Sequence, residues 1–439
     1  MTRVSREVIR NQVWLTFLLL LTSTGFLGKI FPNYPVGVLV DVAGLFLLFE
    51  FLGLITIKNL KLVDTPISGL LLLFLAFGVF QIFNPFLLNP IIGFQGFRAL
   101  FAPMSLFFVG ANLVTTRKQV HTILMYLLYL GSFASILGII QAISVYVGMA
   151  TIVPIGDNYG YYYLGSFLKE KVVLAYGGPL FRITSTFDTF SSFAFFLGMF
   201  ILTGFGFYYS TRKKWFLLLS IVGMIAMLLT FVRIGYVSLL CGSLFLAYLR
   251  SKRKRFRNVL KVLIVASLVV FVFAILPNHA ISERVLSFFS GQSSGSAASA
   301  FMVRISMYRM YIEKFGSRLL IGNGLGTTAG ISAKYAGGLT FGVVTADNDA
   351  INILYQTGVF GLFLFIVIVG RILYYGYRIV EREEPSLLVG SPATIYGILV
   401  FVIVSGLAYN PLVERPSSYL FWFFAGILLS YRHKKGEPG

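Results

Sequence analysis

The chain alternates between long apolar runs and short polar gaps over its whole length. Each run approaches the ~20 residues with which an α-helix crosses the hydrocarbon core of a bilayer. The pattern therefore predicts an all-α, polytopic integral membrane protein, a single transmembrane domain over residues 1–439 with about 12 transmembrane helices. The predicted spans are 11–28, 35–57, 66–83, 95–114, 120–149, 187–209, 215–232, 234–250, 259–277, 350–376, 393–409 and 417–431.

Lysine and arginine gather in the even-numbered gaps and at both ends of the chain. Because positive residues are retained on the cytoplasmic side, we expect both termini to be cytoplasmic. The two long gaps, 150–186 and 278–348, then become extracytoplasmic loops of a protein of the cytoplasmic (inner) membrane. The first run follows a short basic start without a small-residue cleavage site, so we expect it to be the first span and not a cleaved signal.

The formal net charge of +20 raises the question of nucleic-acid binding. The basic clusters, above all Lys252–Arg257, lie where the positive-inside rule places them and where anionic lipid headgroups meet a membrane protein. The charge therefore indicates contact with membrane lipids and no nucleic-acid partner.

The two outer loops differ in composition. The first carries a run of tyrosines within Asp157–Tyr163, whose amphipathic rings suit either a belt at the membrane surface or stacking against sugar faces. We favour the belt and assign these tyrosines no role. The second contains a Gly/Ser/Ala tract, Gly291–Ala300, which is typical of a flexible linker. The stretch Phe301–Arg318 after it has helical periodicity. We therefore expect a large, partly helical extracytoplasmic loop.

Arginines recur on the outer side, where the positive-inside rule disfavours them. Arg304 falls in the middle of the apolar face of the helix predicted for 301–318, so it must snorkel, pair with a carboxylate or bind an anion. The others lie at or near the outer ends of predicted spans: Arg98, Arg182, Arg233 and Arg415. Because a guanidinium fork can hold two phosphate oxygens at once, this recurrence indicates a cationic basin for a phosphate or pyrophosphate.

Polar residues also cluster at the predicted start of the tenth span. Asp347 and Asp349 place two carboxylates at its outer mouth, with Asn348 between them. Asn352 and Gln356 follow one turn apart on the helix and should face a cavity or another helix, in reach of a glycan at the helix mouth. Either aspartate could instead cap the helix by accepting its first backbone N–H groups.

Two further patterns narrow the chemistry. Gly322–Gly326 is superficially like a dinucleotide-binding fingerprint, but no strand precedes it and no βαβ unit can follow it, so we interpret it as a tight turn. No Cys/His cluster or set of converging carboxylates suggests a metal site, so we expect a metal-independent protein without a cofactor.

Three segments resemble those of a known family, and the resemblance covers most of the chain beyond about residue 170. They are Asp347-Asn348-x2-Ile351-x2-Leu354-x-Gln356-x-Gly358-x2-Gly361, Leu-Leu-Thr230-Phe-Val-Arg233-Ile-Gly235, and Phe181-Arg182 through Phe187. On these segments the chain resembles bacterial O-antigen polymerases and O-antigen ligases, which are polytopic glycosyltransferases of the cell envelope. The resemblance implies a GT-C-like helical fold, undecaprenyl-pyrophosphate-linked glycans as donor and acceptor, and a chain-length regulator as a further partner.

The resemblance also implies how the donor would be held. The departing pyrophosphate would be stabilised by arginines, namely Arg98, Arg182, Arg233 and Arg304. The family usually has Ser immediately before the second arginine and Gly immediately after it, whereas this chain has Val232 and Ile234 on the two sides of Arg233.

The acceptor hydroxyl must lose a proton during the transfer. Ligases of the family carry a histidine where Asp347 stands, so the resemblance points to a polymerase with Asp347 as the general base and Asp349 as the reserve candidate. Transfer would run from one undecaprenyl-pyrophosphate carrier to the sugar end of a repeat unit on another carrier.

Two other functions stay open. A ligase that joins polysaccharide to a lipid or other acceptor would use Asp347 in place of the histidine. A flippase or other transporter of lipid-linked glycans would suit twelve spans with both termini inside. Against transport, the last six spans do not repeat the first six, and the polar residues concentrate at one membrane face instead of the midplane.

Overall fold

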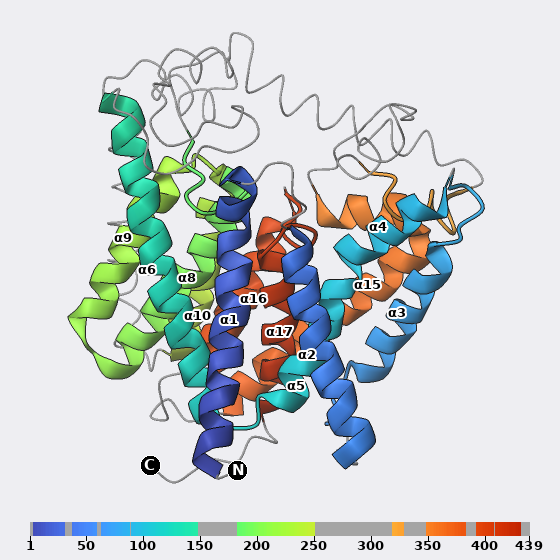
Figure 1. Ribbon diagram of the computed structural model, residues 1–439, viewed down its shortest axis with the longest axis horizontal. Helices are drawn as coiled ribbons and strands as arrows, with labels where there is room; N and C mark the ends of the chain where they lie inside the picture. Colours follow the sequence, from blue (N-terminus) through green and yellow to red (C-terminus); the bar gives the residue numbers. More distant parts are fainter. Residues whose placement is uncertain are drawn as a thin grey trace.

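The computed structural model describes most of the predicted spans as helices (Figure 1). The described residues are 3–30, 37–58, 63–87, 89–147, 182–250, 318–328, 348–382, 392–407 and 409–431. Within these ranges every regular element is a helix, which confirms the predicted all-α class. The helices are α1 (Arg3–Ile30), α2 (Gly37–Lys58), α3 (Ser68–Gln81), α4 (Pro90–Leu100), the 3-10 helix η1 (Ala102–Ser105), α5 (Leu106–Leu113), α6 (Arg117–Val147), α8 (Phe190–Thr211), α9 (Lys214–Leu229), α10 (Arg233–Arg250), α15 (Asp349–Arg382), α16 (Pro392–Ser405) and α17 (Ser417–Leu429).

The predicted number of twelve spans is not confirmed. The span 259–277 lies outside the described residues, and the span 95–114 is broken into α4, η1 and α5, with a bend of 41°. By length and composition α6, α8 and α15 can each cross a membrane, and the bent pair would add a fourth. The other apolar helices are shorter: the 14 residues of α3 rise only about 21 Å, less than the ~30 Å hydrocarbon core.

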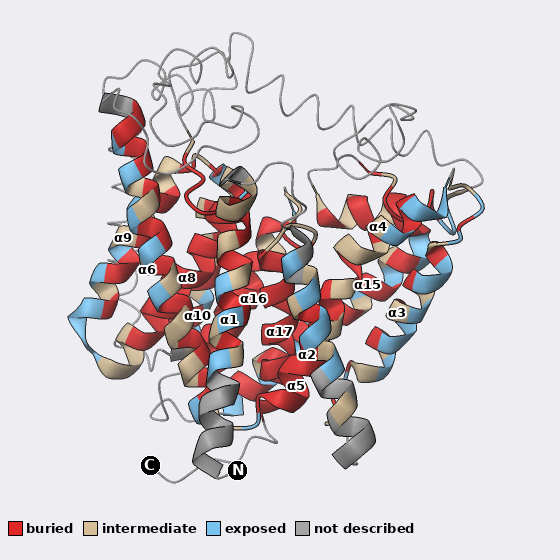
Figure 2. Cartoon of the chain, viewed as in Figure 1, coloured by how far each residue is buried: buried red, intermediate tan, exposed pale blue. Residues whose placement is uncertain are grey.

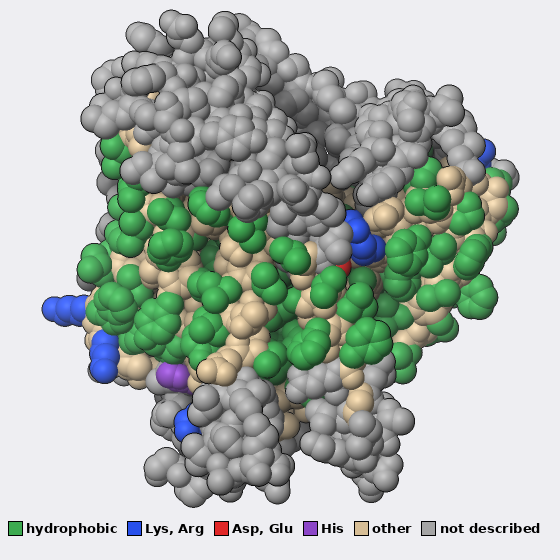
Figure 3. Space-filling model, viewed as in Figure 1, with side chains coloured by type: hydrophobic (Ala, Val, Ile, Leu, Met, Phe, Trp, Pro, Cys, Tyr) green, Lys and Arg blue, Asp and Glu red, His purple; other side chains and the backbone are tan. Residues whose placement is uncertain are grey.

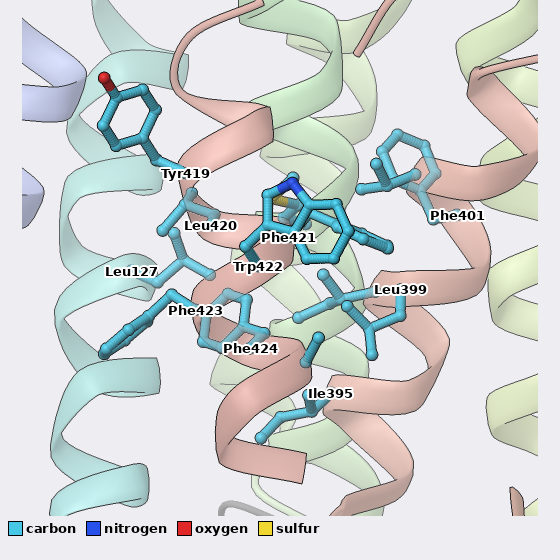
Figure 4. Close-up of a cluster of buried hydrophobic side chains, with 14 of the residues drawn as sticks. Leu127, Ile395, Leu399, Phe401, Tyr419, Leu420, Phe421, Trp422, Phe423 and Phe424 are labelled. Atoms are coloured by element: carbon cyan, nitrogen blue, oxygen red, sulfur yellow. The ribbon is translucent and has the colours of Figure 1, made fainter. Parts of the chain in front are cut away.

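The core of the bundle forms around α17, whose residues from Ser417 to Leu429 are all buried. α17 packs against α5 and α16, and α16 packs in turn against α8 and α10. Figure 4 shows Trp422 on the side of α17 that faces Leu399 and Phe401 of α16, with Leu127 of α6 on the other side. Large aromatic rings therefore fill the centre, where their contact area contributes most to packing.

The outer surface of the bundle is apolar as well. Figure 2 shows buried residues concentrated on α8, α16 and α17, whereas α3, α6 and α9 turn exposed faces outward. These faces carry large hydrophobic side chains, among them Phe80, Phe133 and Trp215. Figure 3 shows the same property as a band of hydrophobic side chains across the molecule. Apolar surface of this extent marks contact with a membrane.

The two ends of the bundle differ in the residues and helix termini that they contain. At the lower end of Figure 1, the Arg117 guanidinium lies 5.0 Å from the centre of the Tyr431 ring, and Arg371 Nη1 donates to the Pro66 carbonyl at 3.1 Å. The lower end also holds most of the described lysines and arginines that lie at or near helix ends: Arg117, Lys118, Arg212, Lys213, Lys214, Arg378 and Arg382. The upper end contains the starts of α2, α8, α10, α15 and α17.

α15 is interrupted near its upper end, and a turn from another part of the chain donates hydrogen bonds to the carbonyls beside the break. At Gly358 the backbone leaves the helical region, with φ 71° and ψ −174°. The residues 318–328, which we call the glycine turn, pack on this break: Asn323 N donates to the Tyr355 carbonyl at 2.9 Å, and Gly324 N donates to the Gln356 carbonyl at 3.0 Å. Non-helical backbone is tolerated at this depth because the protein satisfies its polar groups. The turn agrees with the tight turn predicted from its glycines.

Candidate functional site at the upper end

Arg182 begins a buried segment that joins α6, α9 and α8. Ile183 N donates to the Leu229 carbonyl at the end of α9, and Thr184 N and Ser185 N both donate to Gln141 Oε1 of α6, at 2.9 and 3.0 Å. These bonds fix the backbone next to Arg182. Its guanidinium then lies over the ring of Phe190 at 4.7 Å, which is a cation–π distance.

Arg233 and Arg182 are far apart in the sequence, and both carry charge that acts on the side chain of Tyr236. Arg233 is the exposed first residue of α10, one turn before Tyr236. The Tyr236 hydroxyl donates to the Leu228 carbonyl at 2.9 Å, and the charges of both arginines act on this hydroxyl. The structure therefore places two of the predicted pyrophosphate ligands where their charges act on one side chain, and we call them the Tyr236 pair.

Arg98 and Arg415 lie in a second group, around Asp41 of α2. Arg415 Nη2 donates to Asp41 Oδ1 at 2.7 Å and to Oδ2 at 2.9 Å, and Arg98 Nε lies 3.4 Å from Oδ2. The Tyr419 hydroxyl donates to Oδ1 at 2.6 Å. We call these four residues the Asp41 cluster. Asp41 was missed in the sequence, although an acidic residue inside an apolar run is itself a signal of function.

The start of α15 separates the roles of its polar residues. Asn348 caps the helix: its Oδ1 accepts from Ile351 N at 3.1 Å, while its Nδ2 donates to the Leu407 carbonyl at 2.7 Å. Asp349 is only 3% exposed, and its Oδ2 accepts from Leu412 N at 3.3 Å. Its Oδ1 has no hydrogen-bond partner among the described residues. The capping role considered for either aspartate therefore falls to the asparagine between them.

Asn352 and Gln356 face the glycine turn. Gln356 Nε2 donates to Asn352 Oδ1 at 2.6 Å, and Gln356 Oε1 accepts from Gly326 N, also at 2.6 Å. Both side chains are 3% exposed. The sequence predicted that these amides would face a cavity or another helix, whereas they bond to each other and to the backbone of the glycine turn.

Glu414 connects the two arginine groups. It accepts hydrogen bonds from Ser191 Oγ at 3.1 and 3.0 Å and from Ser192 Oγ at 2.8 Å, at the start of α8. Ser191 follows Phe190, the residue under Arg182, and Glu414 precedes Arg415 of the Asp41 cluster. The charge of Glu414 also acts on Asp349. Polar and charged residues thus extend across the upper end, and the sequence analysis had missed both serines and Glu414.

Two predicted site residues, Asp347 and Arg304, lie outside the described residues. Within the described ranges, no group of three His, Cys, Asp or Glu side chains is placed to hold a metal ion. The positions of Arg98, Arg182, Arg233, Asn348 and Asp349 at the upper end are therefore the described part of the candidate site.

The apolar helical bundle defines a class, that of polytopic membrane proteins. Residues 215–366 match a family model described as O-antigen ligase, and this match supports the O-antigen ligase and polymerase family for the chain. The matched residues contain α9, α10, the glycine turn and the upper part of α15. A search of curated proteins finds no match for the chain. In general terms, the family implies glycosyl transfer with lipid-linked glycans as substrates.

Proposed function

We propose that the protein is a polysaccharide polymerase that joins undecaprenyl-pyrophosphate-linked repeat units at the outer face of the cytoplasmic membrane. The upper end of the bundle is then extracytoplasmic, because the described helix-end lysines and arginines concentrate at the lower end. We assign the chemistry to the upper end, which contains the Tyr236 pair, Glu414 and the start of α15.

The observation that carries this proposal is the position of Arg182 over Phe190 and of Arg233 at the start of α10, from where the charges of both act on Tyr236. Two such guanidinium groups form a charged, directional receptor for a pyrophosphate. Arg233 also stands in the first turn of α10, where the positive end of the helix dipole disfavours a cation. A bound anion would offset both the mutual repulsion of the arginines and this dipole effect.

The transfer requires two changes that these residues suit. The bond between the donor's anomeric carbon and its pyrophosphate oxygen breaks, so negative charge develops on the pyrophosphate, which the Tyr236 pair stabilises together with Arg304. The acceptor hydroxyl oxygen bonds to the anomeric carbon and gives its proton to Asp347. The products are a lengthened glycan on one carrier and undecaprenyl pyrophosphate.

Asp347 is a better candidate for the base than Asp349. The Asp349 carboxylate is 3% exposed and one of its oxygens accepts a backbone N–H, so a sugar hydroxyl has little access to it. Asp347 precedes the capping residue Asn348 and belongs to the large outer loop of the predicted topology.

A ligase is the second candidate, favoured by the description of the matched family as O-antigen ligase. The two functions give different products in a deletion strain. Loss of a polymerase leaves a single repeat unit on the lipid anchor, whereas loss of a ligase leaves finished polymer on undecaprenyl pyrophosphate. Analysis of the glycans in such a strain therefore tests the proposal, and retained polymer on the carrier would contradict it.

The role of the Tyr236 pair is tested in the same strain by complementation. Arg182→Lys and Arg233→Lys keep the charge but lose the fork of donors. We therefore expect each to reduce the rate of polymer formation about tenfold or more, which corresponds to an activation free energy higher by about 1.4 kcal/mol or more. Arg378→Lys, an exposed residue at the lower end, is the matched control and should support normal yield. Normal polymer from both pair variants, at equal protein level, would remove these arginines from the mechanism.

A further inference from the structure

The upper end contains two separate arginine groups. The Tyr236 pair lies between α8 and α10, whereas the Asp41 cluster lies between α2, α4 and α17. Figure 1 places α10 and α4 on opposite sides of α16 and α17. The two groups are therefore separated by the width of the central helices, with Glu414 between them.

The Asp41 cluster carries an excess of positive charge. One carboxylate faces two guanidinium groups, so the cluster has a net charge of +1 when all three groups are ionised. The Tyr419 hydroxyl occupies part of the same carboxylate, because it donates to Oδ1 at 2.6 Å. Asp41 is 11% exposed, and it holds Arg415 closely but Arg98 only loosely.

Arg98 retains a donor that the described protein does not use. A guanidinium has five N–H groups, and Arg98 directs only Nε toward Asp41, at 3.4 Å and without hydrogen-bond geometry. Its Nε has no hydrogen-bond partner among the described residues, and the side chain is 34% exposed.

An internal salt bridge does not account for the second arginine. A carboxylate can neutralise one cation, and a half-buried cation without full compensation is costly. The cost is incurred at the end of the bundle that the positive-inside rule would keep free of arginine. The arrangement is balanced only when an anion joins it.

We propose that the Asp41 cluster is a second pyrophosphate subsite, occupied by the carrier of the second substrate. This inference rests on the proposed function, because a polymerase acts on two lipid-linked glycans and each of them carries a pyrophosphate. The Tyr236 pair holds one carrier and the Asp41 cluster holds the other. Asp41 is a positioning residue that orients the two guanidinium groups. A ligase with an acceptor that lacks pyrophosphate needs only the first subsite.

The number of bound pyrophosphates tests this assignment. The full-length protein in lipid nanodiscs is titrated with radiolabelled farnesyl pyrophosphate, and the bound equivalents are counted by equilibrium dialysis. We expect two equivalents for the unmodified protein and one for the variant Arg182→Gln/Arg233→Gln. We also expect one equivalent for Asp41→Asn/Arg98→Gln/Arg415→Gln, which removes the three charges together and leaves no unpaired carboxylate. Arg378→Gln, at the lower end, should retain two.

A milder variant keeps the test valid if the triple substitution prevents folding. Arg98→Lys retains the charge and loses the fork, so it should weaken one of the two sites about tenfold or more. Inorganic pyrophosphate should displace both equivalents. Displacement of neither equivalent would mean that the prenyl chain and not the anion is recognised, and it would overturn the subsite.

The outcomes distinguish the second subsite from the function on which it rests. One equivalent in the unmodified protein, lost in Arg182→Gln/Arg233→Gln, would overturn the second subsite and leave the polymerase proposal intact. The second subsite would also be overturned if the triple variant still bound two equivalents and Arg98→Lys bound two equivalents with unchanged affinities. Polymer made normally by a deletion strain would instead overturn the polymerase itself.

Discussion

At the scale of the residue, Asn348 and Asp349 at the start of α15 make different contacts. Asn348 provides the cap and a bond to the Leu407 carbonyl, and Asp349 turns inward to the backbone of Leu412. Neither task requires Asp347. The catalytic role proposed for Asp347 therefore does not compete with capping of the helix.

Substitution of Asp347 separates catalysis from stability. Asp347→Asn keeps the shape of the side chain and removes its basicity, so we expect polymerisation to fall by roughly 10²–10⁴ in rate, the usual contribution of a general base. The thermal unfolding midpoint in detergent should stay near that of the unmodified protein, because Asn348 caps the helix. Asp349→Asn is the control; an active Asp347→Asn protein together with an inactive, folded Asp349→Asn protein would move the base two residues along.

At the scale of the element, α15 consists of two helical pieces that meet at Gly358, and the glycine turn packs on this break. Gly358 has a positive φ, and a Cβ there would lie 2.3 Å from the Leu320 carbonyl oxygen of the turn. Gly322 opposes it with φ 72° and similar crowding by Gln356 and Gly358. The close backbone contact leaves no room for side chains at either position.

Two glycines of α15 should respond in opposite ways to alanine. Gly358→Ala forces a left-handed conformation that costs about 1–2 kcal/mol and adds a steric clash, so we expect a lower unfolding midpoint and less folded protein. Gly370→Ala meets nothing within 4 Å, and in a helix interior it should be neutral or stabilise by up to about 1 kcal/mol. Thermal unfolding of the two variants in the same detergent measures the difference. Equal midpoints would contradict the tight packing of the turn on the break.

The hydropathy pattern could predict elements of this kind only in part. Apolar runs located the helices, and glycines located the turn at 322–326, because both signals are local in the sequence. The break at Gly358 and the bend between α4 and α5 lie inside predicted spans, and hydropathy alone does not mark where a helix is interrupted. The pairing of Asp41 with Arg415 joins residues at opposite ends of the chain, so no local pattern contains it.

At the scale of the whole molecule, the two ends of the bundle differ in how their charged residues are arranged. The lower end carries basic residues at the helix ends. At the upper end, Arg98 and Arg415 lie beside Asp41, the charges of Arg182 and Arg233 act on Tyr236, and Arg318 lies over Phe86. Under the positive-inside rule this asymmetry favours the proposed orientation, in which the upper end is extracytoplasmic.

The orientation is measurable with single cysteines. In a Cys241→Ala background, Ser294→Cys in the predicted outer loop should react with an impermeant maleimide in intact spheroplasts. Lys213→Cys, an exposed position between α8 and α9 at the lower end, should react only after lysis. The reverse labelling pattern would refute the orientation, and with it the placement of the site on the extracytoplasmic face.

The attachment of the glycine turn to α15 also bears on how such a protein diversifies. Residues 329–347 run between two fixed points on one helix, since Gly326 bonds to Gln356 and Asn348 caps the helix start. A loop tied in this way can change length at low cost, because each doubling adds only about 0.6 kcal/mol of closure entropy. Insertions and deletions before Asp347 would then reshape the surface offered to the sugar while the membrane scaffold stays unchanged. Recognition of new repeat units could therefore evolve in this segment alone, independently of the carrier lipid and its phosphates.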